Sequence, residues 1–285
     1  MKLIKDINFL IVGLGLLGGS YAKGLKNIGF NVSAITKNQD DIDFAIENKI
    51  IDKGTTEIDP EIIGEADVVV FALYPGVFKD WIKNNQHNFK SGAVITDVTG
   101  VKGSVVYDIQ AILRQDVEFI SAHPMAGKEI SGVRNSDPNI FKGANYIVVP
   151  TEKNTLDAIE LCENIGKMLG FQRVSRLSVE EHDRMIAFLS QLTHCIAVSL
   201  MCCADTEGME KYTGDSFRDL TRIARINDEM WSELFLNNRE DLLFQMEKFK
   251  SSFDELYEKI KTSDREGMRE MMRCSTVRRG LFDKE

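Results

Sequence analysis

The sequence predicts an α/β protein in which a parallel-sheet domain is followed by an all-helical domain. From residue 7 to about 150, short apolar runs alternate with amphipathic segments of helix length, which is typical of β-α-β units on a parallel sheet. After Ser178 the apolar residues recur only with helical spacing. The last of the five prolines is Pro150, so no proline interrupts long helices in the C-terminal part.

Six short apolar runs are predicted to be strands, because each is bounded by Gly, Pro, Asp or Asn. They cover residues 8–12, 31–36, 67–73, 93–97, 118–122 and 145–149. A helix over about 154–169 and a further strand over 171–177 follow them. We expect the sheet domain to span residues 1–172 and the helical domain to span residues 173–285.

The helical domain is predicted to begin with a long helix that runs through Met201. Ser178 and Glu181 have the spacing of a capping box, in which each side chain satisfies a free N–H group at the start of a helix. An apolar stripe follows on one face, at Leu189, Leu192, Ile196 and Leu200. We expect this stripe to be buried against other helices of the chain or against a second copy, and a homodimer is the simplest way to bury it.

Composition excludes several classes of protein. The 35 Lys and Arg residues against 44 Asp and Glu residues give a net charge of −9, which excludes a basic nucleic-acid coat. The five cysteines show no C-x-x-C spacing, so we expect neither a metal site nor a disulfide framework. The best apolar run, residues 66–75, is far shorter than the roughly 18–20 residues of a spanning helix. We therefore expect no membrane partner and a cytoplasmic location.

A glycine-rich motif predicts that the first domain is of the Rossmann type. Gly13, Gly15 and Gly18 form G-x-G-x-x-G between the first predicted strand and a helix over 18–27. The first glycine allows a tight turn, the second lets the backbone contact a pyrophosphate, and the third lets the helix pack close to the strand. The phosphates would meet the positive end of the helix. The cofactor-binding segment therefore consists of Gly13, Leu14, Gly15, Leu16, Leu17 and Gly18.

The end of the second predicted strand bears on the choice between NAD and NADP. Thr36 and Lys37 stand where a carboxylate would hydrogen-bond the ribose of NAD. A hydroxyl followed by a cation would accept a 2′-phosphate, so this pair favours NADP. Asp40 or Asp41 would be the ribose acid of an NAD site if the strand ended later.

Among the four histidines, His123 has the position expected of a functional residue. It comes directly after a predicted strand, at the edge where parallel sheets bind ligands. His87 lies in a polar loop and His182 at a helix start, so we expect both at the surface or in a cap. His194 lies on the long predicted helix, where a buried core histidine is the more common role.

Three arginines occupy one stretch of the second domain. If residues 217–225 form a helix, then Arg218, Arg222 and Arg225 share one face. Such a face is most often solvated, but in a cleft it would bind a dicarboxylate through planar guanidinium groups.

Together these segments resemble the prephenate dehydrogenase family, which includes arogenate dehydrogenases. The resemblance covers nearly the whole chain, in the order of the family. It rests on GLGLLGGS (13–20), TDVTGVKG (96–103), SAHPMAGKE (121–129), SQLTH (190–194) and FRDLTRIARINDEMW (217–231). It implies oxidative decarboxylation of prephenate to 4-hydroxyphenylpyruvate, with hydride transfer to NAD or NADP, in tyrosine biosynthesis.

The resemblance also implies roles for individual residues. His123 would act as the base for the 4-hydroxyl of the substrate, so the rate should fall as the pH drops through its pKa, ordinarily about 6.5. Arg222 would pair with the ring carboxylate, and His194 would line the same pocket rather than the core. The other implied positions are Trp231 and Glu129 at the pocket, Arg218 and Lys128 toward the substrate, and Leu73 and Thr99 beside the cofactor.

Three positions depart from the family pattern. Gly100 replaces a serine that orients the catalytic histidine in many relatives, and Thr99 is the candidate to supply that hydroxyl. Lys128 replaces a frequent threonine, and Gln191 replaces a histidine found in some relatives. Lys128 would disfavour the ammonium of arogenate if it faced the side chain of the substrate.

Three alternatives stay open. One is an arogenate dehydrogenase, and another is a two-domain 3-hydroxyacid dehydrogenase, for which Lys167 and Lys211 lack a convincing setting. The last is a regulator that binds NADP without turnover, which the segment around His123 disfavours.

Overall fold

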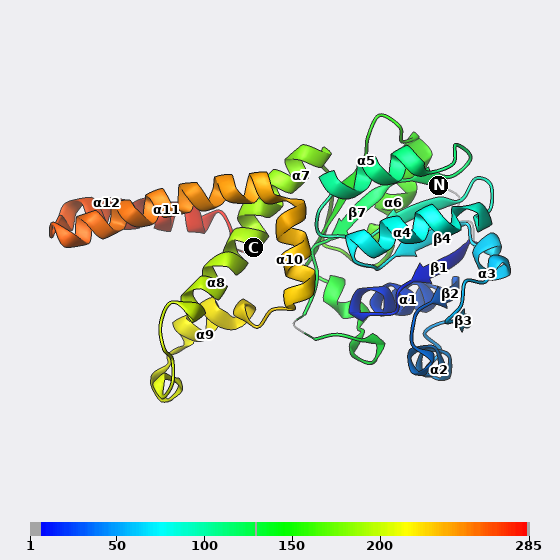
Figure 1. The fold of residues 1–285 in the computed structure, drawn as a ribbon, viewed down its shortest axis with the longest axis horizontal. Coiled ribbons are helices and arrows are strands. Elements are labelled where there is room, and N and C mark those ends of the chain that lie inside the picture. Colours follow the sequence, from blue (N-terminus) through cyan, green and yellow to red (C-terminus); the bar gives the residue numbers. More distant parts are fainter. Residues whose placement is uncertain (1–6, 129, 284–285) are drawn as a thin grey trace.

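The N-terminal part of the protein, seen in a computed structural model that describes residues 7–128 and 130–283, is a parallel sheet covered by helices on both faces (Figure 1). The six strands lie in the order β3-β2-β1-β4-β5-β6. They are β1 (Asn8–Val12), β2 (Asn31–Ile35), β3 (Lys53–Thr55), β4 (Val68–Phe71), β5 (Val94–Asp97) and β6 (Glu118–Phe119). The predicted Rossmann-type parallel sheet is thus confirmed.

Alternate residues of the central strands face two separate cores. In β1, Phe9 and Ile11 pack into one core and Leu10 and Val12 into the other. Burial on both faces explains why these strands are continuously apolar. The first core is covered by α1 (Leu16–Ile28), α2 (Gln39–Glu47) and α6 (Leu156–Met168), and the second by α3 (Pro60–Glu65), α4 (Pro75–Asn85) and α5 (Gly103–Ile112).

The N-terminal part, called the sheet unit below, also contains a second sheet of three strands. This sheet contains β7 (Ser121–Pro124), β8 (Asn145–Val149) and β9 (Arg173–Arg176), with β7 antiparallel and β9 parallel to β8. Since β9 pairs with β8, we propose that the nucleotide-binding unit extends through β9. The helical unit then begins at α7 (Val179–Ile186).

One strand prediction is wrong, and one strand was missed. The single strand expected over 118–122 is divided between β6 and β7, which belong to different sheets. Where the chain changes sheets, Asp97 Oδ1 accepts hydrogen bonds from Ala122 N and Ser121 Oγ at the start of β7. β3 was missed because a three-residue edge strand, Lys-Gly-Thr, has no apolar signal.

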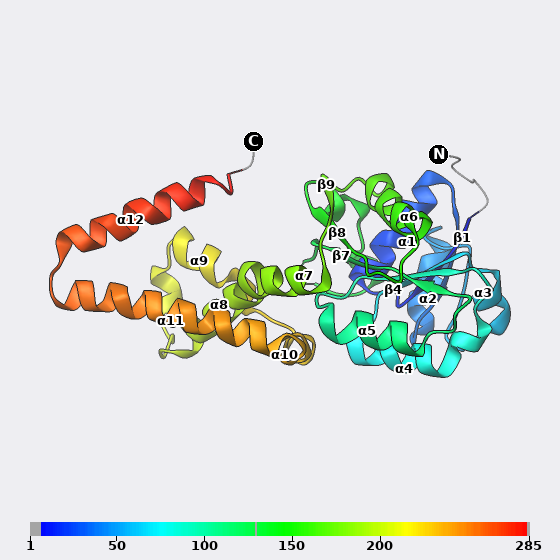
Figure 2. The ribbon, with the colours of Figure 1, turned by 90° about the horizontal axis from the view of Figure 1, so that it is seen from above.

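The C-terminal part is helical and extends away from the sheets (Figures 1 and 2). The Ser178–Glu181 capping box is present with both of its hydrogen bonds. A π-helical turn, Ala187–Gln191, joins α7 to α8 without a break. The remaining helices are α8 (Leu192–Cys202), α9 (Asp215–Thr221), α10 (Asp228–Asn237), α11 (Arg239–Lys261) and α12 (Arg265–Gly280).

The joined helix over Val179–Cys202 has 24 residues and, by length and composition, could span a membrane. This helix does not stand out in a count of uninterrupted apolar residues, because it contains polar ones. Three of these, His182, Asp183 and Gln191, are buried and hydrogen-bonded within the protein. A single such helix is weak evidence for a membrane segment.

Candidate active site

The glycine-rich loop between β1 and α1 has the geometry of a phosphate cradle. Gly13 has a φ of +99°, and a Cβ there would lie 2.5 Å from the carbonyl oxygen of Ala72. A Cβ on Gly18 would lie 1.9 Å from the carbonyl oxygen of Gly13. Among the residues that the structure describes, no other side chain or backbone lies within 4 Å of a Cβ built on Gly15, the N-cap of α1. Open space beside free N–H groups at the start of a helix fits the pyrophosphate of a dinucleotide.

The leucine side chains of the glycine-rich segment pack into the protein. Leu14 and Leu16 are buried, and Leu17 packs against the first core. Leu14 and Leu16 would therefore contact a cofactor through their main chain. Leu73 lies beside the cradle, since its Cδ2 would be 2.9 Å from a Cβ on Gly13.

The residue that directly follows β2 is Thr36, as the sequence suggested. Its N–H donates to the carbonyl of Thr55, and its side chain is half-buried, whereas Lys37 is exposed. Asn38 caps α2 by accepting from Asp40 N at 2.8 Å. Asp40 and its neighbour therefore lie in the first turn of α2. The strand ends at Ile35, one residue earlier than predicted, so Thr36 directly follows it.

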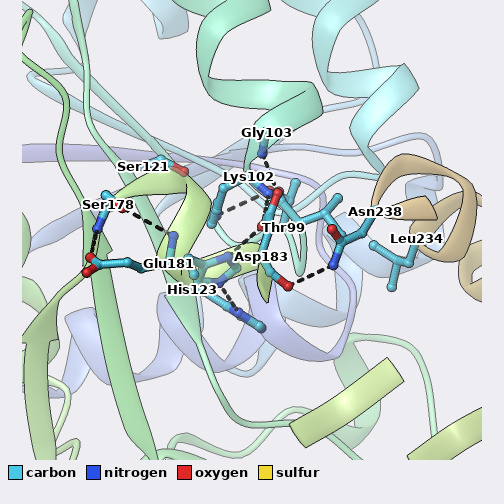
Figure 3. Close-up of polar contacts among 12 residues, drawn as sticks. Thr99, Lys102, Gly103, Ser121, His123, Ser178, Glu181, Asp183, Leu234 and Asn238 are labelled. Carbon is cyan, nitrogen blue, oxygen red and sulfur yellow. Dashed lines mark hydrogen bonds and ion pairs between the residues drawn. The ribbon is translucent and has the colours of Figure 1, made fainter. Parts of the chain in front are cut away.

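His123, on β7, begins a chain of hydrogen bonds that crosses to the helical unit (Figure 3). Its Nδ1 lies 2.8 Å from Nε2 of His182, and Nδ1 of His182 lies 2.7 Å from Oδ1 of Asp183. Asp183 also accepts hydrogen bonds from the backbone N–H groups of Lys102 and Gly103, at 2.9 and 2.7 Å. A carboxylate can only accept, so this end of the chain fixes the direction of every other bond.

The direction of these bonds determines the tautomer of His123. His182 donates from Nδ1 to Asp183 and accepts at Nε2, so His123 must donate from Nδ1. Nε2 of His123 is then an acceptor, and it lies 3.9 Å from where a Cβ on Gly100 would be. His123 thus presents a proton acceptor beside the loop that follows β5.

Burial favours the neutral form of both imidazoles. It lowers the pKa of His123 well below its ordinary value, and the nearby His182 and Lys102 lower that pKa further. Burial also lowers the pKa of His182, while the hydrogen bond to Asp183 partly opposes this shift.

The expectation that His182 lies at the surface or in a cap is wrong, because its exposed fraction is 0%. The helical pattern contained the signal for this position. Val179, His182, Asp183 and Ile186 recur at helical spacing, and all four are buried. His87, in contrast, is exposed, as predicted.

A buried ion pair lies beneath the loop that follows β5. Nζ of Lys102, which is fully buried, donates to Asp97 Oδ2 at 2.9 Å and to the Ala122 carbonyl at 2.7 Å. Burial lowers the pKa of Lys102, and Asp97 opposes this shift. The pair ties the loop after β5 to β7, the strand that carries His123. Neither residue was assigned a role from the sequence, although both lie in the quoted segment 96–103.

Thr99 belongs to this buried network. Its hydroxyl contacts Asp97 Oδ2, donates to the Val101 carbonyl at 3.0 Å and lies 3.2 Å from Nζ of Lys102. The hydroxyl is therefore directed at the ion pair and not at His123. Thr99 therefore does not contact His123 in place of the serine hydroxyl that is missing at Gly100.

His194 and Trp231 lie together at the junction of the two units. Their rings stack with centroids 3.7 Å apart and an interplanar angle of 29°. His194 donates from Nδ1 to the Ser190 carbonyl at 2.9 Å, which leaves Nε2 as its second polar atom. The half-buried position of His194 differs from that of a core histidine.

The three arginines do not share one helix. α9 ends at Thr221, a 3₁₀ turn covers Arg222–Ala224, and Arg225 follows that turn. Arg218 is exposed on α9 and forms an ion pair with Asp215, at 2.5 Å. The single helix that would place Arg218, Arg222 and Arg225 on one face is therefore not formed.

Two of the predicted substrate positions lie next to each other in the sequence. Lys128 is exposed at the end of the first described segment. Glu129 lies outside the described residues.

Two family models match the chain in sequence. The model described as "Prephenate dehydrogenase, nucleotide-binding domain" matches residues 21–174, and the one described as "Prephenate dehydrogenase, dimerization domain" matches residues 178–274. Together they cover the sheet unit from residue 21 onward and most of the helical unit.

Individual relatives agree with these matches. The chain is 31% identical to a prephenate dehydrogenase of Lactococcus lactis over 90% of this chain and 72% of the relative. It is 29% identical to that of Bacillus subtilis over 94% and 74%. The crystal structure of a prephenate dehydrogenase from A. aeolicus in complex with hydroxyphenyl propionate and NAD+ has a TM-score of 0.90 and 32% identity, covering 99% of this chain and 100% of that one. The chain therefore belongs to the prephenate dehydrogenase family of NAD-dependent oxidoreductases.

Proposed function

We propose that this protein converts prephenate to 4-hydroxyphenylpyruvate and carbon dioxide, with transfer of a hydride to NAD or NADP. The observation that carries the proposal is the acceptor Nε2 of His123, held by His182 and Asp183 beside a dinucleotide cradle. A neutral imidazole in this position can accept a proton from the 4-hydroxyl of the substrate. The A. aeolicus relative supports the ligand class, since its structure contains hydroxyphenyl propionate and NAD+.

The chemistry divides between the bound cofactor and the chain. When bound, the nicotinamide accepts the hydride that leaves C4 of the ring. His123 takes the hydroxyl proton as that hydride leaves, and it returns the proton to the phenolate oxygen once the ring carboxylate has left as carbon dioxide. No net proton is released, because the hydroxyl keeps its hydrogen in the aromatic product.

Other side chains would bind and orient the substrate. We assign the ring carboxylate to Arg222, whose guanidinium matches a carboxylate in shape and charge. The stacked pair of His194 and Trp231 would form an aromatic wall of the pocket. Arg218 is a weaker candidate, because Asp215 already neutralises it. Lys128 and Glu129 stay assigned to the substrate by resemblance alone.

For the cofactor, we propose NADP as the preferred dinucleotide. The support is the absence of a carboxylate at Thr36, the residue that directly follows β2, and the exposed cation beside it at Lys37. Asp40 and Asp41 are the competing candidates for an NAD site, and their place within α2 moves them away from the end of the strand. The A. aeolicus relative contains NAD+, which makes NAD⁺ the alternative cofactor.

Arogenate is the alternative substrate. A relative from Zymomonas mobilis that is 28% identical over 89% of this chain is named cyclohexadienyl dehydrogenase, so the family is not uniform in its substrate. We favour prephenate because Lys128 adds a positive charge near the histidine segment, and this charge would repel the ammonium of arogenate.

We also propose that the chain is a cytoplasmic homodimer formed through the helical unit. The matching family model is described as a dimerization domain. An apolar stripe is exposed along α11, where positions spaced by four, four and three residues share one face. Its members are Phe249, Phe253, Tyr257 and Ile260, of which the last three are each more than half exposed. A second copy of the chain would bury these side chains.

The test is to follow reduced nicotinamide by absorbance with each combination of prephenate or arogenate and NAD⁺ or NADP⁺. Turnover with prephenate and NADP⁺ is the expected result. Turnover with arogenate but not with prephenate would make arogenate the substrate. Turnover with NAD⁺ but not with NADP⁺ would make NAD⁺ the cofactor. No turnover in any combination, from protein that binds a dinucleotide, would favour the regulator hypothesis instead.

A further inference from the structure

Helix α10 lies at the junction between the sheet unit and the rest of the helical unit (Figures 1 and 2). One of its side chains, Glu233, crosses this junction. Glu233 Oε1 accepts a hydrogen bond from the backbone N–H of Gly76 at 2.7 Å, across 157 residues of sequence. Asn227, the N-cap of α10, supports the contact by donating to the hydroxyl of Tyr74 at 3.4 Å.

The hydrogen bond to Glu233 satisfies a backbone N–H group in the first turn of α4. The N-cap of this helix, Tyr74, makes no side-chain cap, and Pro75 has no N–H to donate. Gly76 therefore carries the first free N–H group of the helix, and a carboxylate from the other unit takes the place of a local cap. A negative charge is also favoured at the positive end of a helix.

The capped turn forms a wall of the dinucleotide cradle. It links β4 to α4 through Ala72 and Leu73. The carbonyl oxygen of Ala72 would lie 2.5 Å, and Cδ2 of Leu73 2.9 Å, from a Cβ on Gly13. The turn thus packs directly on the glycine loop, and Glu233 holds it three residues beyond Leu73.

The same helix contacts the proposed substrate pocket. Trp231, two residues before Glu233, stacks on His194. The carbonyl of Leu234, the next residue, accepts from Nε2 of Gln191 at 2.9 Å, and its side chain lies 3.7 Å from a Cβ built on Gly100 (Figure 3). One short helix therefore connects the wall of the cofactor cradle with the aromatic wall of the pocket.

We propose that Glu233 is a positioning residue that makes the binding of the dinucleotide and of the aromatic substrate mutually dependent. The inference rests on the proposed function. A ligand that orders the turn at Gly76 favours the docked position of α10, and the docked α10 holds Trp231 against His194. By linkage, a substrate that packs on Trp231 must favour the turn to the same extent.

The experiment measures dinucleotide binding to the full-length protein by calorimetry, with and without saturating hydroxyphenyl propionate. The ratio of the two dissociation constants is the coupling factor. In the wild type we expect a factor on the order of 5–10. Glu233→Ala should bring the factor to within about twofold of 1 while the Kd for the dinucleotide alone changes less than about threefold. Glu233→Gln keeps an acceptor oxygen without the charge and should give an intermediate factor.

Glu229→Gln is the matched control, because it removes an exposed carboxylate from the same helix one turn earlier. It should leave the coupling factor unchanged. A wild-type factor near 1, a full factor in Glu233→Ala, or loss of dinucleotide binding itself in that variant would each overturn the inference. The prephenate turnover assay separates these outcomes from failure of the proposed function, since an active wild type without coupling refutes only the role of Glu233.

Discussion

Nδ1 of His123 lies 2.8 Å from Nε2 of His182, so a histidine of the sheet unit is oriented by a histidine of the helical unit. Asp183 sets the direction of this bond through its own contact with His182. The same carboxylate caps α5 at Gly103, which joins the orientation of the base to the docking of the two units. The base is therefore assembled only when α7 is in place.

Replacement of His182 by Ala is expected to lower kcat by roughly 10–100-fold with little change in KM, because His123 keeps its place but loses its preferred tautomer. His182→Gln retains a side-chain acceptor and should recover part of the loss. Steady-state kinetics with prephenate, together with the Tm of each variant, checks this prediction. His87→Ala replaces an exposed histidine and should match the wild type. Equal kcat in His182→Ala and the wild type would show that Nδ1 of His123 needs no partner.

The dependence of kcat/KM on pH should reflect the neutral form of His123. Burial lowers its pKa well below the ordinary value of about 6.5, and the nearby His182 and Lys102 lower it further. A base with a lowered pKa stays active as the pH falls through 6.5 and loses activity only at more acidic pH. The profile should therefore be flat from about pH 8 to pH 6.5, with its acid limb below that range. An acid limb centred at or above pH 6.5 would contradict the buried setting of His123.

The fold could be predicted from sequence where burial leaves a clear pattern. β1 and β4 are buried on both faces and show uninterrupted apolar residues. β3 could not be found, because a short edge strand needs no apolar residue. The division between β6 and β7 arises where β7 pairs with β8 and contacts Asp97, and no local pattern encodes a contact that spans 24 residues.

The site was predictable to a smaller extent. The motif position of His123 identifies it, but its partner His182 is 59 residues away and was expected near the surface. The helical pattern around Val179 shows that His182 is buried, whereas only the packing of α7 on β7 shows what it contacts. The break after α9 likewise follows from tertiary structure, since residues 217–225 contain no proline or glycine.

Lys102 is expected to be essential for stability. Lys102→Met leaves the carboxylate of Asp97 buried without its cation, which should lower the free energy of unfolding by about 3–5 kcal/mol. Urea denaturation of the full-length protein measures this change. Lys79→Met removes an exposed ion pair with Asp108 and should cost at most about 1 kcal/mol. A loss in Lys102→Met no larger than in this control would mean that Asp97 takes up a proton or is hydrated in the variant.

Lys37 provides the test of cofactor choice. Lys37→Ala removes the cation proposed to face the 2′-phosphate and should raise KM for NADP⁺ by roughly tenfold, with KM for NAD⁺ unchanged. Thr36→Asp introduces the missing carboxylate and should reverse the preference toward NAD⁺. Kinetics with both dinucleotides give the ratio directly. Lys83→Ala, an exposed lysine of α4, is the control. An unchanged ratio in both Lys37→Ala and Thr36→Asp would move the ribose contact to Asp40 or Asp41.

Arg222 should contribute to substrate affinity and not to cofactor affinity. Removal of a guanidinium that pairs with a desolvated carboxylate costs about 2–5 kcal/mol, which corresponds to a rise of roughly 30- to 4,000-fold in the Kd for prephenate. Arg222→Ala should therefore raise KM strongly and leave the Kd of the dinucleotide within about twofold. Arg225→Ala is the matched control, since Arg225 follows the same 3₁₀ turn and is exposed. If Arg225→Ala weakened prephenate binding and Arg222→Ala did not, the carboxylate contact would belong to the residue after the turn.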